Sequence, residues 1–298
     1  MGAEGEAPEW DEVVMQGGNR LAGLAVDQGT IFVASSGSGE VMTVPSDDER
    51  DSGGRDLLPY SFTGGVPSSM AFDSEGALFV ADFAFKCILS KPADESEWMP
   101  VVADYEGRQF FGPNSICFAK DNGTLFFTDS GPMGDTSLST PKGSVFCVPP
   151  EDRLLKPLAF ECLAHPAGIV SRGDGSVVYV AETMANRVLR FVRKANDVYY
   201  SSVFYQFNGG LGPTALALDR ENRLYVARYE FAELGDSSTR GSIAVLDETG
   251  TMLMEIPAPG PEMTGMVLSE GSDGGDVLYV SEQSSGKVFQ LPLGSFYD

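Results

Sequence analysis

Hydrophobic and polar positions follow a pattern that recurs six times along the chain. In each copy, a short apolar stretch leads through a turn rich in Asp and Gly into a β-branched or aromatic run, as in VPSSMAFDSEGALFVAD. Two apolar runs joined by such a turn predict a β-hairpin. The six copies begin at Leu21, Val66, Gly112, His165, Gly212 and Glu262.

The spacing of the copies indicates how many strands each one contains. Their equivalent aromatic residues lie 47, 47, 53, 46 and 54 residues apart, at Phe32, Phe79, Phe126, Tyr179, Tyr225 and Tyr279. A third strand such as GSVFCV usually follows each hairpin, and runs such as SSVFYQF supply a fourth. Repeats of this length are typical of β-propeller blades.

The last repeat ends before a fourth strand can form, and residues 9–14, EWDEVV, resemble the outer strand EWMPVV of the second repeat. We expect the N-terminal segment to complete the last sheet, because this closure leaves neither chain end as an unpaired edge. The sequence therefore predicts an all-β fold, a six-bladed β-propeller closed by an N-terminal strand in the last blade. It forms one domain over residues 1–298.

Charge narrows the range of partners. The chain carries 20 basic and 43 acidic residues, a formal net charge of −23. Such a surface repels nucleic-acid phosphates and anionic lipids, so we expect a small-molecule substrate or ligand, no nucleic acid and no membrane insertion. Any protein partner is left unidentified.

No apolar run is long enough for a membrane span and the start lacks a secretory signal, which favours a soluble, cytoplasmic protein. A secreted form with a trimmed signal also fits.

The four cysteines, at positions 87, 117, 147 and 162, have no CxxC spacing and adjoin apolar segments, so we expect buried thiols. The chain contains no P-loop, GxSxG elbow or HExxH motif. These absences argue against nucleotide-dependent, serine-hydrolase and zinc-protease chemistry.

Propeller geometry predicts where chemistry would occur. Counting back along the innermost strand of each blade gives one axis-facing position per repeat, and these positions converge on one mouth of the channel. They are Ala22, Ser68, Asn114, Ala167, Thr214 and Thr264. The ends of the second strands are expected slightly farther out, as a mainly acidic ring with one Arg, at Ser35, Asp82, Asp129, Glu182, Arg228 and Glu282.

Two connections are unusually long, at residues 130–142 and 229–240, and both are expected to overhang this mouth from opposite sides. Long loops in compact folds frequently carry specificity, although they are also found as ordinary surface loops. Tyr229, at the start of the second connection, is a candidate substrate-binding residue together with Ser68, Thr214, Thr264 and Arg228.

Several segments carry a resemblance to a known family. PNSI before GTLFFTDS, PAGI before VVYVAETMANRVLRF, and GPTALALD before RLYVA are similar to the senescence-marker/gluconolactonase superfamily. FFTDS and VAETMANRVLRF resemble its strictosidine synthase-like branch more closely. The resemblance implies a six-bladed propeller that hydrolyses lactones, aryl esters or organophosphates, or that condenses an amine with an aldehyde.

The resemblance also bears on cofactors. Hydrolases of the superfamily hold a divalent cation, commonly calcium, with a Glu, two Asn and an Asp. Of the four matching positions only Asn114 keeps a family ligand, and the others hold Ala22, Ala167 and Thr214. We therefore expect no cofactor; if a cation such as calcium is present, Asn114 would bind it. Strictosidine synthase works without a metal, through a glutamate near the start of its last blade, where this chain has Thr264 and, two residues earlier, Glu262.

Three functional hypotheses follow. The first is an enzyme that hydrolyses a lactone or ester, in which Asn114 and Thr214 hold the carbonyl oxygen while Glu182, Asp129 or His165 activates water. The second is a metal-free condensation or rearrangement enzyme that uses Glu262. The third is a non-catalytic propeller that binds a metabolite or protein.

The candidate residues also have ordinary structural explanations. Asn114 can cap a turn, and a single histidine before a proline, His165, is commonly structural. Asp129 and Glu182 can accept hydrogen bonds from backbone amides. Arg228 can orient a substrate carboxylate or neutralise Glu182 or Glu282.

Overall fold

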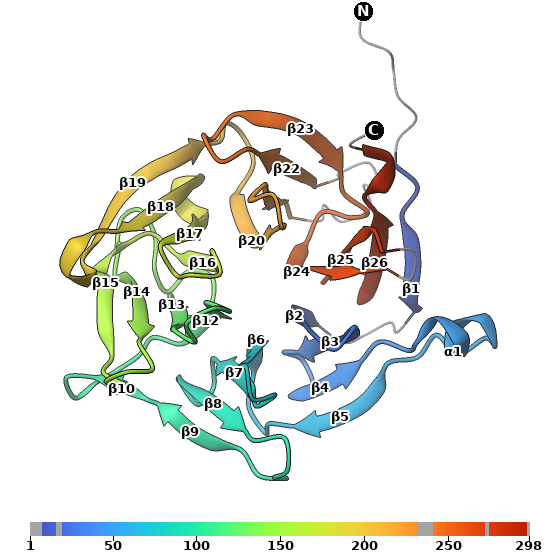
Figure 1. The fold of residues 1–298 in the computed structure, drawn as a ribbon, viewed down its shortest axis with the longest axis horizontal. Helices are drawn as coiled ribbons and strands as arrows, with labels where there is room; N and C mark the ends of the chain where they lie inside the picture. Colours follow the sequence, from blue (N-terminus) through green and yellow to red (C-terminus); the bar gives the residue numbers. More distant parts are fainter. Residues whose placement is uncertain (1–7, 16–19, 232–240, 272–273, 297–298) are drawn as a thin grey trace, which may run out of the picture.

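Six four-stranded antiparallel sheets form a ring around a central axis (Figure 1), and two cavities along this axis make up a central channel. The computed structural model describes residues 8–15, 20–231, 241–271 and 274–296. The prediction of an all-β, six-bladed β-propeller is confirmed. We letter the strands of each blade A to D from the channel outward.

Each of the first five blades is a continuous segment of chain. In order A to D, the strands are β2 (Leu21–Asp27), β3 (Thr30–Ser35), β4 (Glu40–Thr43) and β5 (Leu58–Phe62) in blade 1; β6 (Pro67–Phe72), β7 (Leu78–Asp82), β8 (Cys87–Lys91) and β9 (Met99–Val102) in blade 2; β12 (Pro113–Phe118), β13 (Leu125–Asp129), β14 (Gly143–Val148) and β15 (Lys156–Leu163) in blade 3; β16 (Pro166–Ser171), β17 (Val177–Glu182), β18 (Arg187–Arg193) and β19 (Tyr199–Gln206) in blade 4; and β20 (Gly212–Leu218), β21 (Leu224–Tyr229), β22 (Ser242–Leu246) and β23 (Met252–Pro257) in blade 5.

Blade 6 contains both ends of the chain, in the strand order β24 (Met263–Glu270), β25 (Asp276–Glu282), β26 (Lys287–Pro292) and β1 (Asp11–Met15). Asp11 pairs with Gln290, and Lys287 Nζ lies 2.7 Å from the Glu12 carboxylate. Just before β1, the Trp10 indole donates a hydrogen bond of 2.9 Å to the carbonyl of Pro257 in blade 5. The predicted closure by an N-terminal strand is confirmed, and it covers the edge of β26 that would otherwise be unpaired.

The remaining elements are short. They are a hairpin of β10 (Asp104–Tyr105) and β11 (Arg108–Gln109), the helix α1 (Asp47–Asp51), and the 3-10 turns η1 (Thr183–Ala185), η2 (Ala195–Asp197) and η3 (Gly294–Phe296). Ser46 and Glu49 form a capping box at the start of α1. None of the helices in the described part of the chain is long and apolar enough to cross a membrane.

The hydrophobic core lies between the blades. Six clusters of buried side chains each join two neighbouring blades, as where Tyr179 of blade 4 and Leu224 of blade 5 share one cluster. A single sheet cannot bury both of its apolar faces, so each blade is stabilised by the two beside it. This packing leaves the axis open and places the six A strands around it.

Two of the four cysteines are buried as predicted, whereas Cys117 is only partly buried and Cys162 is exposed. All four thiols are free, and Cys87 and Cys147 are buried. Burial raises the pKa of Cys87 to about 11 and the pKa of Cys147 to about 12, which leaves little reactive thiolate at neutral pH. The prediction of a buried thiol is wrong for Cys162, which is exposed because it lies on the outermost strand β15.

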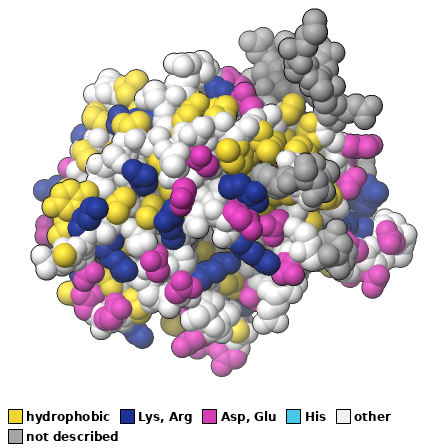
Figure 2. Space-filling view, turned by 45° about the horizontal axis from the view of Figure 1, so that its top comes forward, with side chains coloured by type: hydrophobic (Ala, Val, Ile, Leu, Met, Phe, Trp, Pro, Cys, Tyr) yellow, Lys and Arg dark blue, Asp and Glu magenta, His cyan; other side chains and the backbone are white. Residues whose placement is uncertain are grey.

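Figure 2 shows how charge is distributed over one face of the molecule. Basic side chains lie among acidic and hydrophobic ones on this face, so the surplus of acidic residues does not form one continuous patch there. The charge around the channel must therefore be determined from the residues that line it.

Candidate functional site

A β-bulge at the same point in every A strand turns one side chain toward the channel. The register with strand B shifts just after the first pair of each blade, or after the second pair in blade 5, for example between Pro67 and Ser69 and between Pro213 and Ala215. A bulge re-aims the side chains next to it. The residues at these bulges are the six that the strand pattern placed on the axis.

These six residues line one cavity of about 590 Å³ at one mouth of the channel: Ala22, Ser68, Asn114, Ala167, Thr214 and Thr264. The wall above them comes from the residues that precede the A strands, including Arg20, Val66 and His165, and from loops that follow the B strands. A volume of this size can hold a small organic molecule.

The acidic residues at the ends of the B strands point elsewhere. Asp129 accepts hydrogen bonds from the backbone N–H groups of Phe111 and Gly112, at 3.1 and 2.8 Å. Glu182 accepts one of 2.8 Å from the N–H of Ala164, and its other oxygen lies 2.6 Å from Arg187 Nε.

Asp82 and Glu282 are bound to backbone N–H groups in the same way. Among the described residues that line the cavity there is no Asp or Glu. The expected acidic ring at the mouth is therefore wrong, because each carboxylate satisfies backbone amides that would otherwise be buried without partners.

Burial raises the pKa of Asp129 to about 6, although its two backbone hydrogen bonds and the charge of Lys86 act in the opposite direction. Asp129 is 3% exposed and is not among the residues that line the cavity. Its altered pKa reflects burial in the blade, and neither Asp129 nor Glu182 is placed to activate a water molecule inside the cavity.

Arg228 also lies outside the cavity lining. Its guanidinium pairs with Glu255 at 3.2 Å, donates to the carbonyls of Asn208 and Gly209, and lies over the ring of Phe207. Neither expected partner, Glu182 or Glu282, is the one it contacts. The structure thus gives Arg228 a role in holding the outer part of blade 5.

The hydroxyl groups on the cavity floor connect neighbouring blades. Thr214 Oγ1 donates to the carbonyl of Met263 at 2.8 Å, and Thr264 Oγ1 donates to Leu21 at 2.9 Å. Ser68 Oγ lies within hydrogen-bond distance of the carbonyls of Ala81 and Pro113. Since each hydroxyl has one proton, these groups face the cavity as acceptors. The expectation that Thr214 donates to a substrate carbonyl is therefore wrong.

Asn114 retains a polar group for a ligand. Its side-chain amide donates one hydrogen bond of 2.9 Å to Ser130 Oγ, which in turn donates to the carbonyl of Gly131. An Asn amide has two N–H donors and one acceptor, so this bond fixes the side chain without using all of its capacity. Asn114 is the floor residue best suited to donate a hydrogen bond to a substrate oxygen.

His165 combines several unusual properties on the cavity wall. The residue is 3% exposed and has a φ of 56°, in the left-handed region. Its Nδ1 is buried without a hydrogen-bond partner. Burial lowers the pKa of the imidazole to about 4, against a smaller opposing effect of Asp135. At neutral pH the ring is therefore uncharged and can accept a proton.

Titration of this imidazole can be observed directly. Because His165 is the only histidine in the chain, its ring protons give a single set of NMR signals that needs no assignment. We expect a titration midpoint near pH 4 in the folded protein and about 6.5 in urea. A midpoint of 6 or above in the folded state would show that the ring is hydrated and would remove the reason for a neutral base at this position.

Tyr229 and Glu262 form a pair beside the cavity. The Tyr229 ring lines it, whereas Glu262 is absent from the described lining residues. Burial raises the pKa of Tyr229, and so does its hydrogen bond with the Glu262 carboxylate. The backbone N–H of Glu262 also donates to Glu282 at 3.0 Å. Glu262 is thus separated from the cavity by a phenol that stays protonated.

Two long connections contribute apolar side chains to the rim. Pro132 and Met133 come from the β13–β14 connection, and Phe231 comes from the β21–β22 connection. Residues 232–240 of the second connection lie outside the described residues. The two connections belong to blades 3 and 5, which flank blade 4, so the expectation that they face each other across the channel is wrong.

Arg20 is a lining residue that the strand pattern did not identify. It precedes the first paired residue of its A strand, Leu21, just as His165 precedes Pro166. Residues two apart in a strand share a face, so the position before Leu21 faces the same side as Ala22. Applying this rule to every repeat would have identified Arg20, Val66 and His165, which line the cavity, but also Glu262, which does not.

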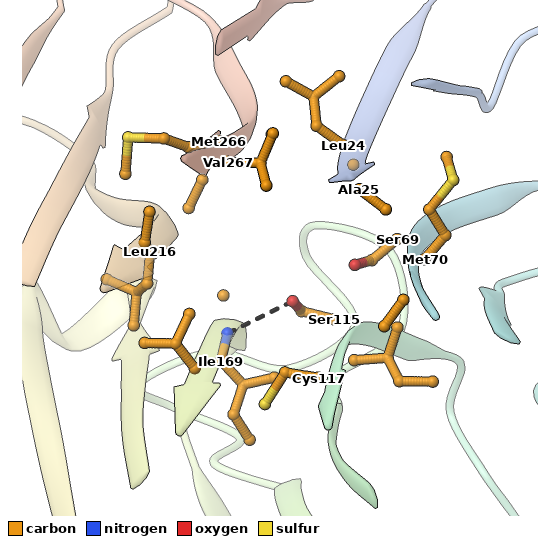
Figure 3. Close-up of a pocket in the computed structure, with 18 of the residues that line it drawn as sticks. Leu24, Ala25, Ser69, Met70, Ser115, Cys117, Ile169, Leu216, Met266 and Val267 are labelled. Atoms are coloured by element: carbon orange, nitrogen blue, oxygen red, sulfur yellow. Dashed lines mark hydrogen bonds between the residues drawn. The ribbon is translucent and has the colours of Figure 1, made fainter. Parts of the chain in front are cut away.

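A second cavity, of about 260 Å³, continues the channel toward the opposite face. Figure 3 shows its apolar side chains converging from the A strands, including Leu24, Met70, Leu216 and Met266. Ser115 lies among them, with its hydroxyl 3.3 Å from the N–H of Ile169. The two cavities share Ser68, Asn114, Thr214 and Thr264, which therefore form the neck between them.

The described cavity lining does not suit a calcium ion. Calcium requires six to eight oxygen ligands, usually with several carboxylates. Of the four positions that match the calcium ligands of the superfamily, Asn114 offers an amide oxygen and Thr214 a hydroxyl, while Ala22 and Ala167 offer no ligand atom. Among the described residues there is also no cluster of three His, Cys, Asp or Glu side chains that could hold a metal.

Comparisons with known proteins agree with this architecture. The family model described as the SMP-30/Gluconolactonase/LRE-like region matches residues 131–284. Lactonase drp35 of Staphylococcus saprophyticus is 27% identical over 272 residues, which cover 88% of this chain and 77% of the relative.

Two solved structures share the fold. A gluconolactonase from Xanthomonas campestris has a TM-score of 0.74 and 20% identity, with 96% of this chain and 89% of that chain covered. Regucalcin from Agrobacterium tumefaciens, described as a calcium-binding protein, has a TM-score of 0.73 and 18% identity, with coverage of 96% and 94%. The matches support the wider family and do not single out a strictosidine synthase-like branch.

Proposed function

Because the chain belongs to the SMP-30/gluconolactonase/LRE-like family, we propose that it is an enzyme that hydrolyses a lactone in the cavity at the mouth of its channel. The observation that carries this proposal is the convergence of Asn114, Arg20 and His165 on one cavity. Hydrogen-bond donors for the carbonyl oxygen and a neutral base for the attacking water both accelerate ester hydrolysis.

In this mechanism the lactone carbonyl oxygen accepts hydrogen bonds from the Asn114 amide and the Arg20 guanidinium. Both groups stabilise the negative charge that develops on this oxygen in the transition state. Tyr229 has its proton directed at Glu262 and the floor hydroxyls have theirs directed at backbone carbonyls, so these groups serve as acceptors for other parts of the substrate.

His165 is the proposed base. As water attacks the carbonyl carbon, one of its protons passes to the neutral imidazole. When the ring C–O bond of the lactone breaks, the imidazolium returns this proton to the departing alkoxide, and the product is a hydroxy acid. A base with a low pKa is a weak proton acceptor, but it is fully in its reactive form at neutral pH.

A panel of lactones and aryl esters tests the proposal. We expect turnover of at least one lactone, followed as acid release in a pH-stat, and a rate that changes less than twofold with a chelator or with added calcium. Asn114→Ala should lower kcat/KM about tenfold, because one of two hydrogen bonds to the carbonyl oxygen is lost.

Other outcomes would contradict specific parts of this proposal. A rate abolished by the chelator and restored by calcium would show that the described lining misses a metal ligand. If no lactone or ester were hydrolysed but a ligand bound in the channel, the protein would be a binding propeller or an enzyme of another class. An unchanged rate in Asn114→Ala would remove this residue from the carbonyl site.

A further inference from the structure

Much of the described rim of the cavity is apolar, in contrast to its floor, although Ser36 and Gln283 also line it. Met133 and Phe231 are 40% and 55% exposed, and both line the same cavity as Phe83 and Pro132. Isolated exposed apolar residues are common on protein surfaces, but several gathered around one concave site indicate contact with an apolar ligand group. Phe231 also packs edge-on against the buried ring of Tyr229, with ring centroids 5.6 Å apart, which supports its position at the rim.

The floor offers few free donors. The hydroxyls of Ser68, Thr214 and Thr264 donate to backbone carbonyls of the protein, and the Ser36 hydroxyl near the rim donates to the carbonyl of Arg20 at 3.0 Å. A substrate with a hydroxyl on every ring carbon would need a hydrogen-bond partner from the protein for each hydroxyl. These partners would have to lie at the rim of the cavity as well as at its floor. Polar substrate groups that meet Phe83, Met133 and Phe231 would lose their water without gaining a partner.

The charge of the cavity lining restricts the substrate further. Although the whole chain carries a net charge of −23, the described lining contains Arg20 and no carboxylate. This lining does not repel the carboxylate of a hydroxy-acid product, and it has no acidic group to bind a cationic substrate.

We infer that the substrate is an uncharged lactone with an apolar alkyl or aryl substituent, and not a polyhydroxylated sugar lactone. This inference rests on the proposed function. The lactone head lies at the floor beside Asn114 and His165, and the substituent extends to Met133 and Phe231 at the rim. These two side chains determine specificity without taking part in the chemistry.

A homologous series measures this preference. With δ-hexalactone, δ-octalactone and δ-decalactone, kcat/KM should rise at least about tenfold from the methyl to the pentyl substituent. A fully buried methylene contributes about fourfold, and the rim leaves part of the chain in water. Glucono-δ-lactone should be a poorer substrate than δ-decalactone by a similar factor.

The double variant Met133→Ser/Phe231→Ser should lose about tenfold toward δ-decalactone and stay within twofold toward δ-hexalactone. Leu138→Ser is the matched control, since Leu138 lies in the same connection as Met133, is 69% exposed and is not among the cavity-lining residues. Leu138→Ser should leave kcat/KM unchanged for all three lactones of the series. A flat series, or glucono-δ-lactone as the best substrate, would overturn the inference while the proposed function stood.

Binding of lactams separates the two proposals, because lactams are not hydrolysed under these conditions. A δ-lactam with a pentyl group should bind at least tenfold more tightly than unsubstituted δ-valerolactam in calorimetry, and the double variant should abolish the difference. This result without any lactone turnover would support the apolar site and refute the hydrolase. Equal affinities for the two lactams would refute the apolar site.

Discussion

His165→Asn is expected to lower kcat/KM for the best lactone by about 10²-fold or more, the usual contribution of a general base. Asparagine is the appropriate replacement because His165 has a left-handed backbone conformation that Asn tolerates better than most other residues. The fold should therefore persist, and the lost rate should reflect the missing proton acceptor. Initial rates at neutral pH, measured with matched thermal unfolding curves, check this prediction.

The pH dependence gives an independent test of the same group. A base must be unprotonated to act, and the pKa of His165 is lowered to about 4, so wild-type kcat/KM should be constant between pH 5 and 8. Below about pH 4 it should fall tenfold per unit, as the imidazole becomes protonated. An acid limb near pH 6.5 would indicate a hydrated imidazole.

Gln28→Asn is the control for the substitution itself, since Gln28 has a φ of 47° and lies in the β2–β3 turn, outside the cavity. This variant should keep wild-type activity and stability. If His165→Asn also kept its activity, the base would have to be found elsewhere, and hydrolysis through His165 would be wrong.

Glu182→Ala is expected to lower the free energy of unfolding by about 3 kcal/mol. The substitution leaves the N–H of Ala164 buried without its acceptor and removes the 2.6 Å ion pair with Arg187. Glu182 is 2% exposed, so water cannot replace these interactions without opening the blade. Urea unfolding measures the loss.

Glu182→Gln separates this structural role from catalysis. A glutamine oxygen still accepts the bond from Ala164, so the backbone before His165 keeps its position and kcat/KM should stay within threefold of wild type. A catalytic carboxylate could not be replaced by an amide in this way. A large loss of activity in Glu182→Gln without loss of stability would restore Glu182 as the base.

The matched control is Glu161→Ala. Glu161 pairs with Arg108 at 3.3 Å on the surface, where the two side chains are 40% and 68% exposed. Exposed pairs of this kind contribute little, and we expect a change below about 0.5 kcal/mol. The contrast between Glu161 and Glu182 would show that the effect comes from burial and from the backbone bond.

The repeat pattern was sufficient to predict the fold and its closure. Strand alternation and the 46- to 54-residue spacing fixed the number of blades, and the similarity of residues 9–14 to an outer strand identified the closing segment. The same alternation identified the positions from Ala22 to Thr264 that line the channel. These features could be predicted because successive side chains of a strand point to opposite faces, so the alternation is visible in the sequence.

The direction of the charged side chains could not be predicted in this way. Asp129 and Glu182 occupy strand ends that border the mouth, yet both turn toward N–H groups of a loop 17 or 18 residues earlier in the chain. Arg228 pairs with Glu255 on β23, the outermost strand of the same blade, two strands away from its own strand β21. The partner of each charged side chain depends on the conformation of nearby loops. Only the folded blade shows which backbone N–H groups of these loops need an acceptor.

The sequence by itself thus determined the six blades, their closure and the ring of axis-facing positions. Only the tertiary structure decided that the mouth has a neutral floor, a largely apolar rim among the described residues, and Arg20 and His165 on its wall. The physical reason is that alternation assigns a residue to a face of its own strand, whereas the chemistry of a cavity depends on which polar groups the assembled blades have already satisfied. Those groups include backbone amides and carbonyls, which carry no sequence signal of their own.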